Sequence, residues 1–190
     1  DALGGGAACA RVVQMDGSMT SVEYHTGVDH ALGRFSERLG ARPVRLVAPL
    51  FADPDTVRAL ERDSIVSQAL AAARSAEVML FGVGSVSTST TLFEGAYIDT
   101  EVLGELQELG AVGEIGGRFY GLDGAPVASS LVERTVSVPL EDIRRCPTAI
   151  LTSGGEHRRE SILGALRGGF ATALVTDRPT AQWLLAEQKG

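Results

Sequence analysis

Short apolar segments alternate with amphipathic segments along most of the chain. Runs of apolar residues bounded by glycine, proline or aspartate are typical of buried strands, and apolar residues with helical spacing are typical of helices that cover a sheet. The predicted strands are Ala10–Met15, Pro43–Ala48, Glu77–Val83, Ala111–Ile115, Thr148–Thr152 and Thr172–Thr176. The predicted helices lie near 27–39, 54–61, 63–75, 100–109 and 140–144, after Gly155 and after Asp177.

Local signals add helix starts and a turn to this pattern. Thr100, followed by Glu101, is predicted to be an N-cap, because a side-chain oxygen there accepts a free backbone N–H. Asp177 is predicted to cap the terminal helix in the same way. Asp123-Gly124 predicts the tip of a hairpin or loop between 118 and 127.

The alternation of strands and helices predicts the α/β class, with a doubly wound, mostly parallel sheet and helices on both faces. A length of 190 residues fits one compact domain over 1–190. In such folds ligands bind beyond the carboxyl ends of the strands, where the connecting loops meet. We therefore look for chemistry in the loops that follow the predicted strands.

Composition and charge exclude several classes of protein. The formal net charge is −7, and no cluster of lysine and arginine is present that would release counterions from DNA. This segment is therefore not expected to hold DNA by itself. The two cysteines, Cys9 and Cys146, lie far apart, so neither a disulfide framework nor a zinc site is indicated, and a reducing cytoplasm is expected. No signal peptide and no apolar run of about 18 residues is found, so no membrane contact is expected.

The segment Thr152–Arg158 has the most specific local pattern. A predicted strand leads into Gly154 and Gly155, and a helix is predicted to begin at once. Glycines let a backbone approach an anion closely, and the N–H groups of a helix start attract phosphate. Arg158 adds a forked cationic donor. A plain strand-to-helix turn with a solvated arginine explains the same spacing equally well.

Three further loops carry groups that suit a polyol or a phosphate. Gly82, Val83, Gly84 and Ser85 follow a strand and lead into a hydroxyl-rich run from Ser87 to Thr91. The loop is neither a Walker loop, because no Gly-Lys-Ser/Thr follows, nor a complete dinucleotide fingerprint. An ordinary glycine turn is the alternative.

Two carboxylates also lie at strand ends. Glu114 stands between glycines at 113 and 116, where it would accept hydrogen bonds from sugar hydroxyls. Asp16 and Gly17 end the first strand, although aspartate at such a position often serves a turn. Read alone, both positions fit a structural role as well as a binding role.

The sequence gives little support for catalysis or for metal binding. His25, His30 and His157 do not have the spacing of zinc ligands. No nucleophile elbow and no acid–base pair is recognisable. We therefore expect no enzyme activity, no metal and no cofactor.

Taken together, these loops resemble the effector-binding domain of the SorC/DeoR-type bacterial sugar-responsive regulators, over roughly residues 10–186. The stretches that carry the resemblance are Gly82–Ser85, Leu109–Tyr120, Asp123-Gly124, Leu140–Arg144, Gly154-Gly155, Ile162–Gly169, Leu174–Asp177 and Ala181. The resemblance implies a fold like that of glucosamine-6-phosphate deaminase and ribose-5-phosphate isomerase, used for sensing. It places ligand contacts at Asp16, Gly17, Gly82, Val83, Gly84, Ser85, Glu114, Gly154, Gly155 and Arg158.

The same resemblance implies partners. It implies a phosphorylated sugar or related carbohydrate as effector, DNA contact only through an N-terminal helix-turn-helix domain absent from this chain, and homodimers or homotetramers. The first strand and phosphate loop of the family are also expected to be absent. The family commonly has lysine where this chain has Arg158 (or Arg159, if the alignment shifts by one). Arginine does not form an imine with an open-chain sugar, so covalent capture is not expected.

Two other functions fit the same fold. A sugar-phosphate isomerase or deaminase would turn over its ligand, and a dinucleotide-binding domain would bind NAD. The first lacks a poised base or nucleophile, and the second lacks a complete glycine fingerprint. The sequence favours an effector-binding domain that controls DNA binding allosterically.

Overall fold

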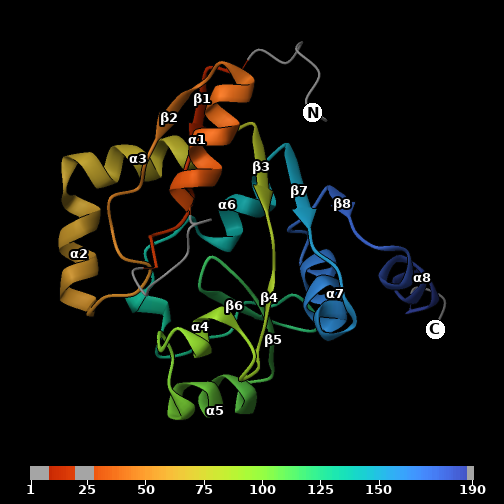
Figure 1. Cartoon of the computed structure of the whole chain (residues 1–190). Helices are drawn as coiled ribbons and strands as arrows, with labels where there is room; N and C mark the ends of the chain where they lie inside the picture. The colour runs from red at the N-terminus through yellow and green to blue at the C-terminus, as the bar shows by residue number, and fades with distance from the viewer. Residues whose placement is uncertain (1–8, 20–27, 188–190) are drawn as a thin grey trace.

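The structure, a computed structural model, describes residues 9–19 and 28–187 (Figure 1). Its strands are β1 (Arg11–Val13), β2 (Arg42–Val44), β3 (Val78–Phe81), β4 (Gly84–Ser85), β5 (Ala111–Ile115), β6 (Arg118–Gly121), β7 (Thr148–Thr152) and β8 (Ala173–Val175). Its α-helices are α1 (Val28–Leu39), α2 (Pro54–Arg62), α3 (Ser64–Arg74), α4 (Thr91–Glu94), α5 (Thr100–Glu108), α6 (Leu140–Arg145), α7 (Arg159–Arg167) and α8 (Arg178–Glu187). The 3₁₀ turn η1 (Val132–Arg134) lies between β6 and α6, and the 3₁₀ turn η2 (Glu156–Arg158) lies directly before α7.

The described strands form three small sheets. β1 pairs with β2, and β7 lies between β3 and β8, all in parallel. β5 pairs on both edges in the antiparallel sense, with β4 and with β6. The α/β class with mostly parallel pairing is therefore confirmed, and the antiparallel sheet is an addition that the alternating pattern did not predict.

The helices divide among these sheets (Figure 1). The main core packs Met79 and Phe81 of β3 and Leu151 of β7 against α6 and α7, and Ile143 and Ile162 of those helices are fully buried. A second core lies between α5 and β5, and a third lies beneath α2 and α3. Burial of this apolar surface is the main favourable term that holds the elements together.

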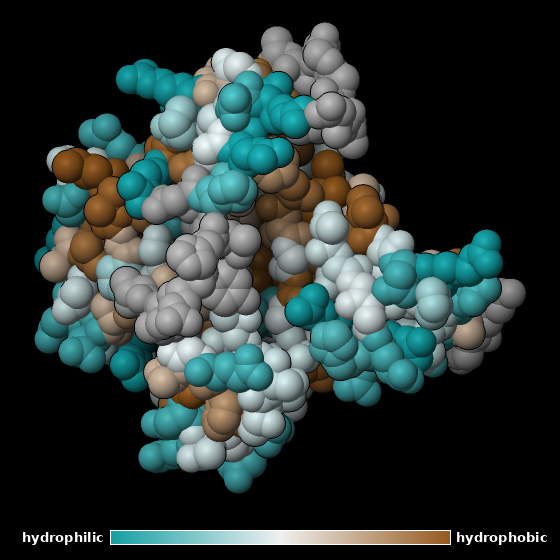
Figure 2. All heavy atoms as spheres, viewed as in Figure 1, coloured by the Kyte–Doolittle hydropathy of each residue, from teal (hydrophilic) through white to brown (hydrophobic). Residues whose placement is uncertain are grey.

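One face of the β3–β7–β8 sheet is open. The outward residues Val78 and Leu80 of β3 are 58% and 46% exposed, and Val175 of β8 is 56% exposed. Figure 2 shows hydrophobic side chains gathered over β3 and β7 on the face in view. Parallel sheets are normally covered on both faces, so the predicted cover of helices is missing here among the described residues.

The hairpin tip at Asp123-Gly124, just after β6, packs tightly on α7 through glycines. Gly124 has a positive φ of 78°, and a Cβ atom at this position would lie 2.2 Å from the Cα atom of Gly168. A Cβ atom on Gly164 would lie 2.7 Å from the carbonyl oxygen of Gly121. The predicted tip at Asp123-Gly124 is therefore confirmed, and its glycines let the tip touch the helix backbone.

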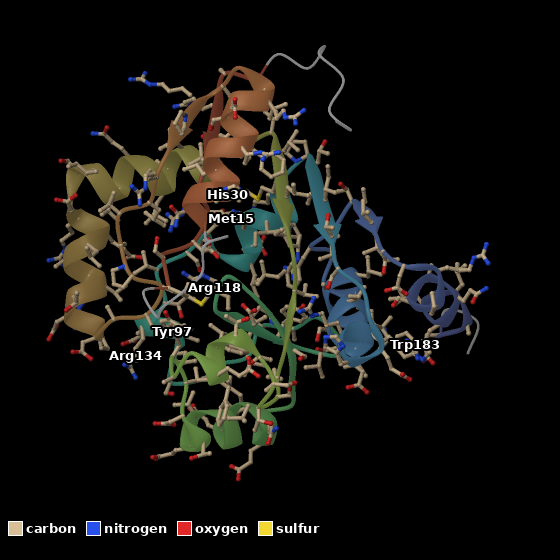
Figure 3. All side chains as sticks on the ribbon, in the orientation of Figure 1. Met15, His30, Tyr97, Arg118, Arg134 and Trp183 are labelled. Carbon is tan, nitrogen blue, oxygen red and sulfur yellow. The ribbon has the colours of Figure 1, made fainter. Side chains whose placement is uncertain are left out.

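The terminal helix α8 meets α7 through one charged and one aromatic side chain. The guanidinium carbon of Arg159 lies 5.9 Å from the ring centroid of Trp183, a cation–π contact. Trp183 lies on α8 at the edge of the molecule (Figure 3). The predicted cap of this helix is confirmed, because Asp177 Oδ1 accepts the Thr180 N–H at 2.8 Å.

Three local predictions were wrong. Asp99, not Thr100, caps α5, since its side chain accepts the Val102 N–H at 2.9 Å. The strand predicted over Pro43–Ala48 is limited to β2 (Arg42–Val44), because regular pairing with β1 stops at Val44 and only isolated contacts, such as the Ser18 N–H to the Ala48 carbonyl at 2.8 Å, continue beyond it. No α-helix begins directly after Gly155, because η2 comes first and α7 starts at Arg159.

Within residues 9–19 and 28–187, no helix is both long enough and apolar enough to cross a membrane.

Candidate functional site

The loops that follow β3 and β7 meet the end of β1 and the strand β5 around one pocket, which we call the strand-end pocket. Its volume is about 360 Å³. It is lined by Asp16, Met19, Leu50, Gly82, Val83, Gly84, Ser85, Ser89, Thr90, Thr91, Leu92, Glu114, Gly116, Gly117, His157 and Arg158. It lies where loops beyond parallel strands are expected to hold a ligand.

Glu114 is held across the antiparallel pair of β4 and β5. It lies opposite Gly84, and a Cβ atom on Gly84 would lie 2.2 Å from its Oε1 atom. Its Oε2 atom accepts the Gly117 N–H at 2.8 Å. Glycine at position 84 therefore makes room for the carboxylate, and one carboxylate oxygen is already fixed by the turn after β5.

Asp16 is the second carboxyl group of the pocket. Its backbone forms an antiparallel bridge with Ser137, and Gly116 approaches it so closely that a Cβ atom there would lie 3.2 Å from the Asp16 Cβ atom. Burial raises the pKa of Asp16 from 3.8 to about 6. Burial also raises the pKa of Glu114; the Gly117 N–H opposes this rise, and the nearby Asp16 charge adds to it. The two groups thus make an acidic side that holds protons more readily than free carboxylates do.

Hydroxyl groups and a cation line the rest of the pocket. Ser89, Thr90 and Thr91 come from the loop that leads into α4. The hydroxyl of Ser87 links this loop together, because it is 3.4 Å from the Ser85 hydroxyl and 3.1 Å from that of Ser89. Arg158 is exposed, and its side chain makes no hydrogen bond or ion pair with another described residue. Its charge is therefore available to a ligand.

The pocket gathers most of the residues singled out from the sequence, but not all. Asp16, Gly82, Val83, Gly84, Ser85, Glu114 and Arg158 line it. Gly17, Gly154 and Gly155 do not. Gly17 is a packing residue, because a Cβ atom there would lie 2.3 Å from the carbonyl oxygen of Pro49. The Gly155 N–H, predicted to bind phosphate, is donated to Asp177 Oδ2 at 2.7 Å.

Several lining residues were not selected from the sequence. The hydroxyls of Ser89, Thr90 and Thr91 belong to the run noted after the strand that ends near Val83, so a signal for them existed. His157 lies within the Gly-Gly segment that was already under consideration. Met19 and Leu50 are apolar, and nothing in their sequence context distinguishes them from core residues.

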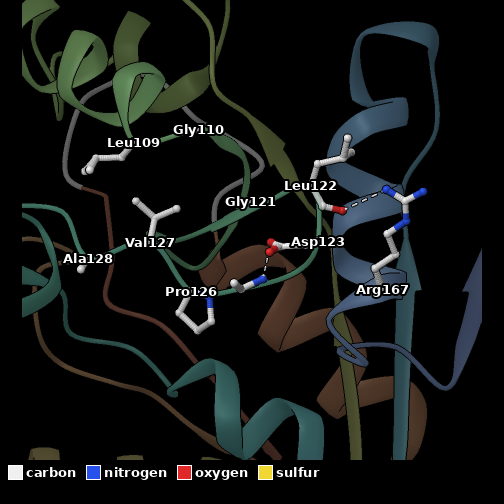
Figure 4. Close-up of a pocket in the computed structure, with 10 residues that line it drawn as sticks. Leu109, Gly110, Gly121, Leu122, Asp123, Pro126, Val127, Ala128 and Arg167 are labelled. Carbon is white, nitrogen blue, oxygen red and sulfur yellow. Dashed lines mark hydrogen bonds between the residues drawn. The ribbon is translucent and has the colours of Figure 1, made fainter.

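A second pocket, of about 580 Å³, lies at the hairpin tip beside α5 and α7 (Figure 4). It is lined by Leu109, Gly110, Gly121, Leu122, Asp123, Ala125, Pro126, Val127, Ala128 and Arg167. Its charged groups already have protein partners: Asp123 accepts the Ala125 N–H at 2.9 Å, and Arg167 donates to the Leu122 carbonyl at 3.4 Å. The strand-end pocket, with its acidic side and available arginine, is therefore the better candidate.

Within the described part of the chain, no group of three or more histidine, cysteine, aspartate or glutamate side chains is arranged to hold a metal ion. His30 lies on α1 (Figure 3) and does not line the strand-end pocket, and His25 lies outside the described residues.

Comparison with known proteins connects this geometry to a family. Residues 7–186 match the family model described as "Putative sugar-binding domain". The chain is 32% identical over 175 residues to the deoxyribonucleoside regulator of Bacillus subtilis strain 168, covering 92% of the chain and 56% of that protein. It is 30% identical over 178 residues to the transcriptional regulator LsrR of Escherichia coli K12, covering 92% and 54%.

A solved structure agrees with the sequence match. The full-length sorbitol operon regulator SorC of Klebsiella pneumoniae superposes with a TM-score of 0.84 at 26% identity, covering 92% of this chain and 57% of that one. The chain belongs to the sugar-binding domain family of SorC/DeoR-type transcriptional regulators. It spans about half the length of the curated relatives that it matches.

Proposed function

We propose that this chain is the effector-binding domain of a sugar-responsive transcriptional regulator and that a phosphorylated sugar binds in the strand-end pocket. The observation that carries the proposal is that one pocket is lined by two carboxyl groups, several hydroxyls and a guanidinium that makes no hydrogen bond or ion pair with another described residue. A phosphosugar has complementary groups, since its hydroxyls pair with carboxyl groups and its phosphate pairs with arginine.

The carbohydrate end of the ligand is proposed to lie against Asp16 and Glu114. An ionised carboxylate accepts hydrogen bonds from sugar hydroxyls, and a protonated one also donates. Because the pKa of Asp16 is raised to about 6, both forms are accessible near neutral pH. The acidic side would also repel a phosphate, which fixes the orientation of the ligand.

The phosphate is proposed to lie against Arg158 and the hydroxyls of Ser85, Ser89, Thr90 and Thr91. This placement differs from the helix start predicted from the sequence, because Asp177 already accepts the Gly155 N–H. Arginine retains the charge of the family's usual lysine but forms no imine, so binding is proposed to be reversible and without turnover.

Arg158→Ala should lower the affinity for the phosphosugar by about 10- to 100-fold, because hydrogen bonds to a charged group contribute a binding free energy of that size. Titration calorimetry would compare three phosphosugars, ribose 5-phosphate, glucose 6-phosphate and fructose 6-phosphate, each with its parent sugar. Arg62→Ala removes an exposed arginine of α2 outside the pocket and is the control. The assignment is wrong if no phosphosugar binds better than its parent sugar or if Arg158→Ala binds like Arg62→Ala.

Control of DNA is proposed to reside in further polypeptide of the whole regulator. The chain covers 56% of the length of the B. subtilis relative and carries a net charge of −7, which does not suit DNA contact. The effector would favour one of two arrangements of a homodimer or homotetramer and so change operator affinity. Its place of action would be the bacterial cytoplasm, where the operator DNA is.

We also propose that further polypeptide of the regulator covers the open face of the β3–β7–β8 sheet. Leu80→Lys should then change the free energy of unfolding of residues 1–190 by less than about 1 kcal/mol, but destabilise the whole regulator by about 2 kcal/mol or more. Leu185→Lys, at a leucine of α8 that is 61% exposed, is the matched control for urea unfolding. Equal effects of Leu80→Lys in the two polypeptides would refute the cover.

A further inference from the structure

Asp177 lies outside the strand-end pocket, yet it is bound to the loop that carries Arg158 into it. The residue follows β8 and caps α8, with Oδ1 accepting the Thr180 N–H at 2.8 Å. Its Oδ2 atom accepts the Gly155 N–H at 2.7 Å and the Thr180 hydroxyl at 3.0 Å. One carboxylate therefore joins the start of α8 to the turn after β7, which is 22 residues earlier in the chain.

The turn after β7 is shaped around this carboxylate. A Cβ atom on Gly154 would lie 2.2 Å from Asp177 Oδ2, so glycine leaves the space that the carboxylate fills. Gly155 has φ 95° and ψ 148°, a backbone conformation that is essentially restricted to glycine. Glycine adopts this conformation without strain but can adopt many others, so contacts must select it. The Gly155 N–H donates to Asp177 Oδ2 at 2.7 Å and more weakly to the Thr180 hydroxyl oxygen at 3.3 Å, and these contacts select it.

The turn leads directly to the pocket. The Arg158 N–H donates to the Gly155 carbonyl at 3.1 Å and closes η2, from which His157 and Arg158 line the pocket. The backbone direction at Gly155 therefore sets where the Arg158 side chain begins. The guanidinium has no hydrogen bond or ion pair to another described residue, so the held part of Arg158 is its backbone, which fixes the direction in which the side chain leaves η2.

We propose that Asp177 is a positioning residue for the effector: its carboxylate holds the Gly154-Gly155 turn so that Arg158 points into the strand-end pocket. The proposal rests on the proposed function, because Arg158 is taken as the phosphate contact. Hydrogen bonds from Thr180 and Gly155 also hold the pKa of Asp177 below its usual value, so the carboxylate is ionised at neutral pH and accepts strongly.

Asp177→Ser separates the two roles of the residue. Serine is a good N-cap, so the cap of α8 is retained, but its side chain is too short to reach the Gly155 N–H. Asp99→Ser makes the same change at the cap of α5, which does not touch the pocket, and is the matched control. Gly154→Ala is a second variant, because its methyl group displaces the Asp177 carboxylate while the residue itself stays.

Asp177→Ser should weaken binding of the tightest phosphosugar of the panel by about 5- to 10-fold, with Gly154→Ala similar and Asp99→Ser within about 2-fold of the wild type. If Asp177 acts through Arg158, the loss disappears in the Arg158→Ala background, where Asp177→Ser should change affinity less than about 2-fold. An equal loss in both backgrounds, or with Asp99→Ser, would mean a general structural effect and overturn the proposal.

An increase, rather than a loss, of phosphosugar affinity in Asp177→Ser would have a different meaning. If the phosphate bound the Gly155 N–H itself, removal of the competing carboxylate would strengthen binding, and Asp177→Ser would then overturn the positioning role. The anchor is also testable without any ligand. Amide hydrogen exchange at Gly155 should be at least about 10-fold faster in Asp177→Ser than in the wild type. Unchanged exchange rejects the anchor, whereas absent phosphosugar binding with faster exchange rejects only the proposed function.

Discussion

Gly124→Ala is expected to lower the free energy of unfolding by about 3 to 5 kcal/mol. The new methyl group would lie 2.2 Å from the backbone of Gly168, and neither the hairpin tip nor the end of α7 can yield without repacking. The positive φ of 78° adds a further penalty for any side chain. Urea unfolding followed by circular dichroism would measure the change.

The matched control for this substitution has the opposite sign. Gly104 lies within α5, and a Cβ atom there would meet no heavy atom within 4 Å. Gly104→Ala should therefore raise the free energy of unfolding by about 0.5 to 1 kcal/mol, since alanine favours the helix. A Gly124→Ala protein within about 1 kcal/mol of the wild type would show that the tip does not pack on α7 as described.

Asp16→Asn is expected to stabilise the domain at neutral pH and leave it unchanged in acid. The folded state holds the Asp16 proton up to a pH of about 6, whereas the unfolded state releases it near 3.8. The folded state therefore binds more protons between these values, and its stability falls as the pH rises through them. Above about pH 7 the buried charge costs up to about 3 kcal/mol, and asparagine removes that cost.

Unfolding curves at pH 4 and pH 7.5 would test this dependence. The difference between Asp16→Asn and the wild type should be about 2 kcal/mol at pH 7.5 and close to zero at pH 4. Asp55→Asn, which changes an exposed carboxylate of α2 that pairs with Arg58, should stay within about 0.5 kcal/mol of the wild type at both values, because exposed pairs of this kind contribute little to stability. A pH-independent difference would mean that Asp16 acts through packing rather than charge.

A stabilised variant that binds the effector less well would indicate that the pocket retains Asp16 for binding.

The sequence predicts the elements of this fold well where the signal is local. β5 and β7 have the predicted bounds: β7 is an apolar run between two threonines, and β5 alternates buried with less buried positions and is closed by Gly116. The antiparallel sheet was not predicted, since Gly84 and Ser85 carry no strand pattern and pair with β5 only through tertiary contact. Thr100 and Asp99 are both good caps, and only the final backbone geometry decides between them.

The residues of the candidate site show the same difference between local signals and tertiary contacts. Asp16, Gly82 and Arg158 follow β1, β3 and β7, and they come together because the loops beyond parallel strands meet at one edge. Glu114 and Ser85 join them through the antiparallel pairing of β5 with β4, which the sequence pattern did not predict. Gly155 was assigned to phosphate on local grounds that hold for an isolated helix start. Its partner is instead Asp177, and no local pattern in a single sequence relates residues that far apart.

The contact between Arg159 and Trp183 gives the chain an intrinsic fluorescence probe. Trp183 is the single tryptophan of the sequence, and its indole ring lies beside the residue that follows Arg158. Any ligand that shifts the 155–159 segment changes the electrostatic field at this ring, and therefore its fluorescence. If the proposed effector binds and shifts this segment, a titration of the unlabelled protein should show a fluorescence change that arises at the junction of α7 and α8 rather than in the pocket.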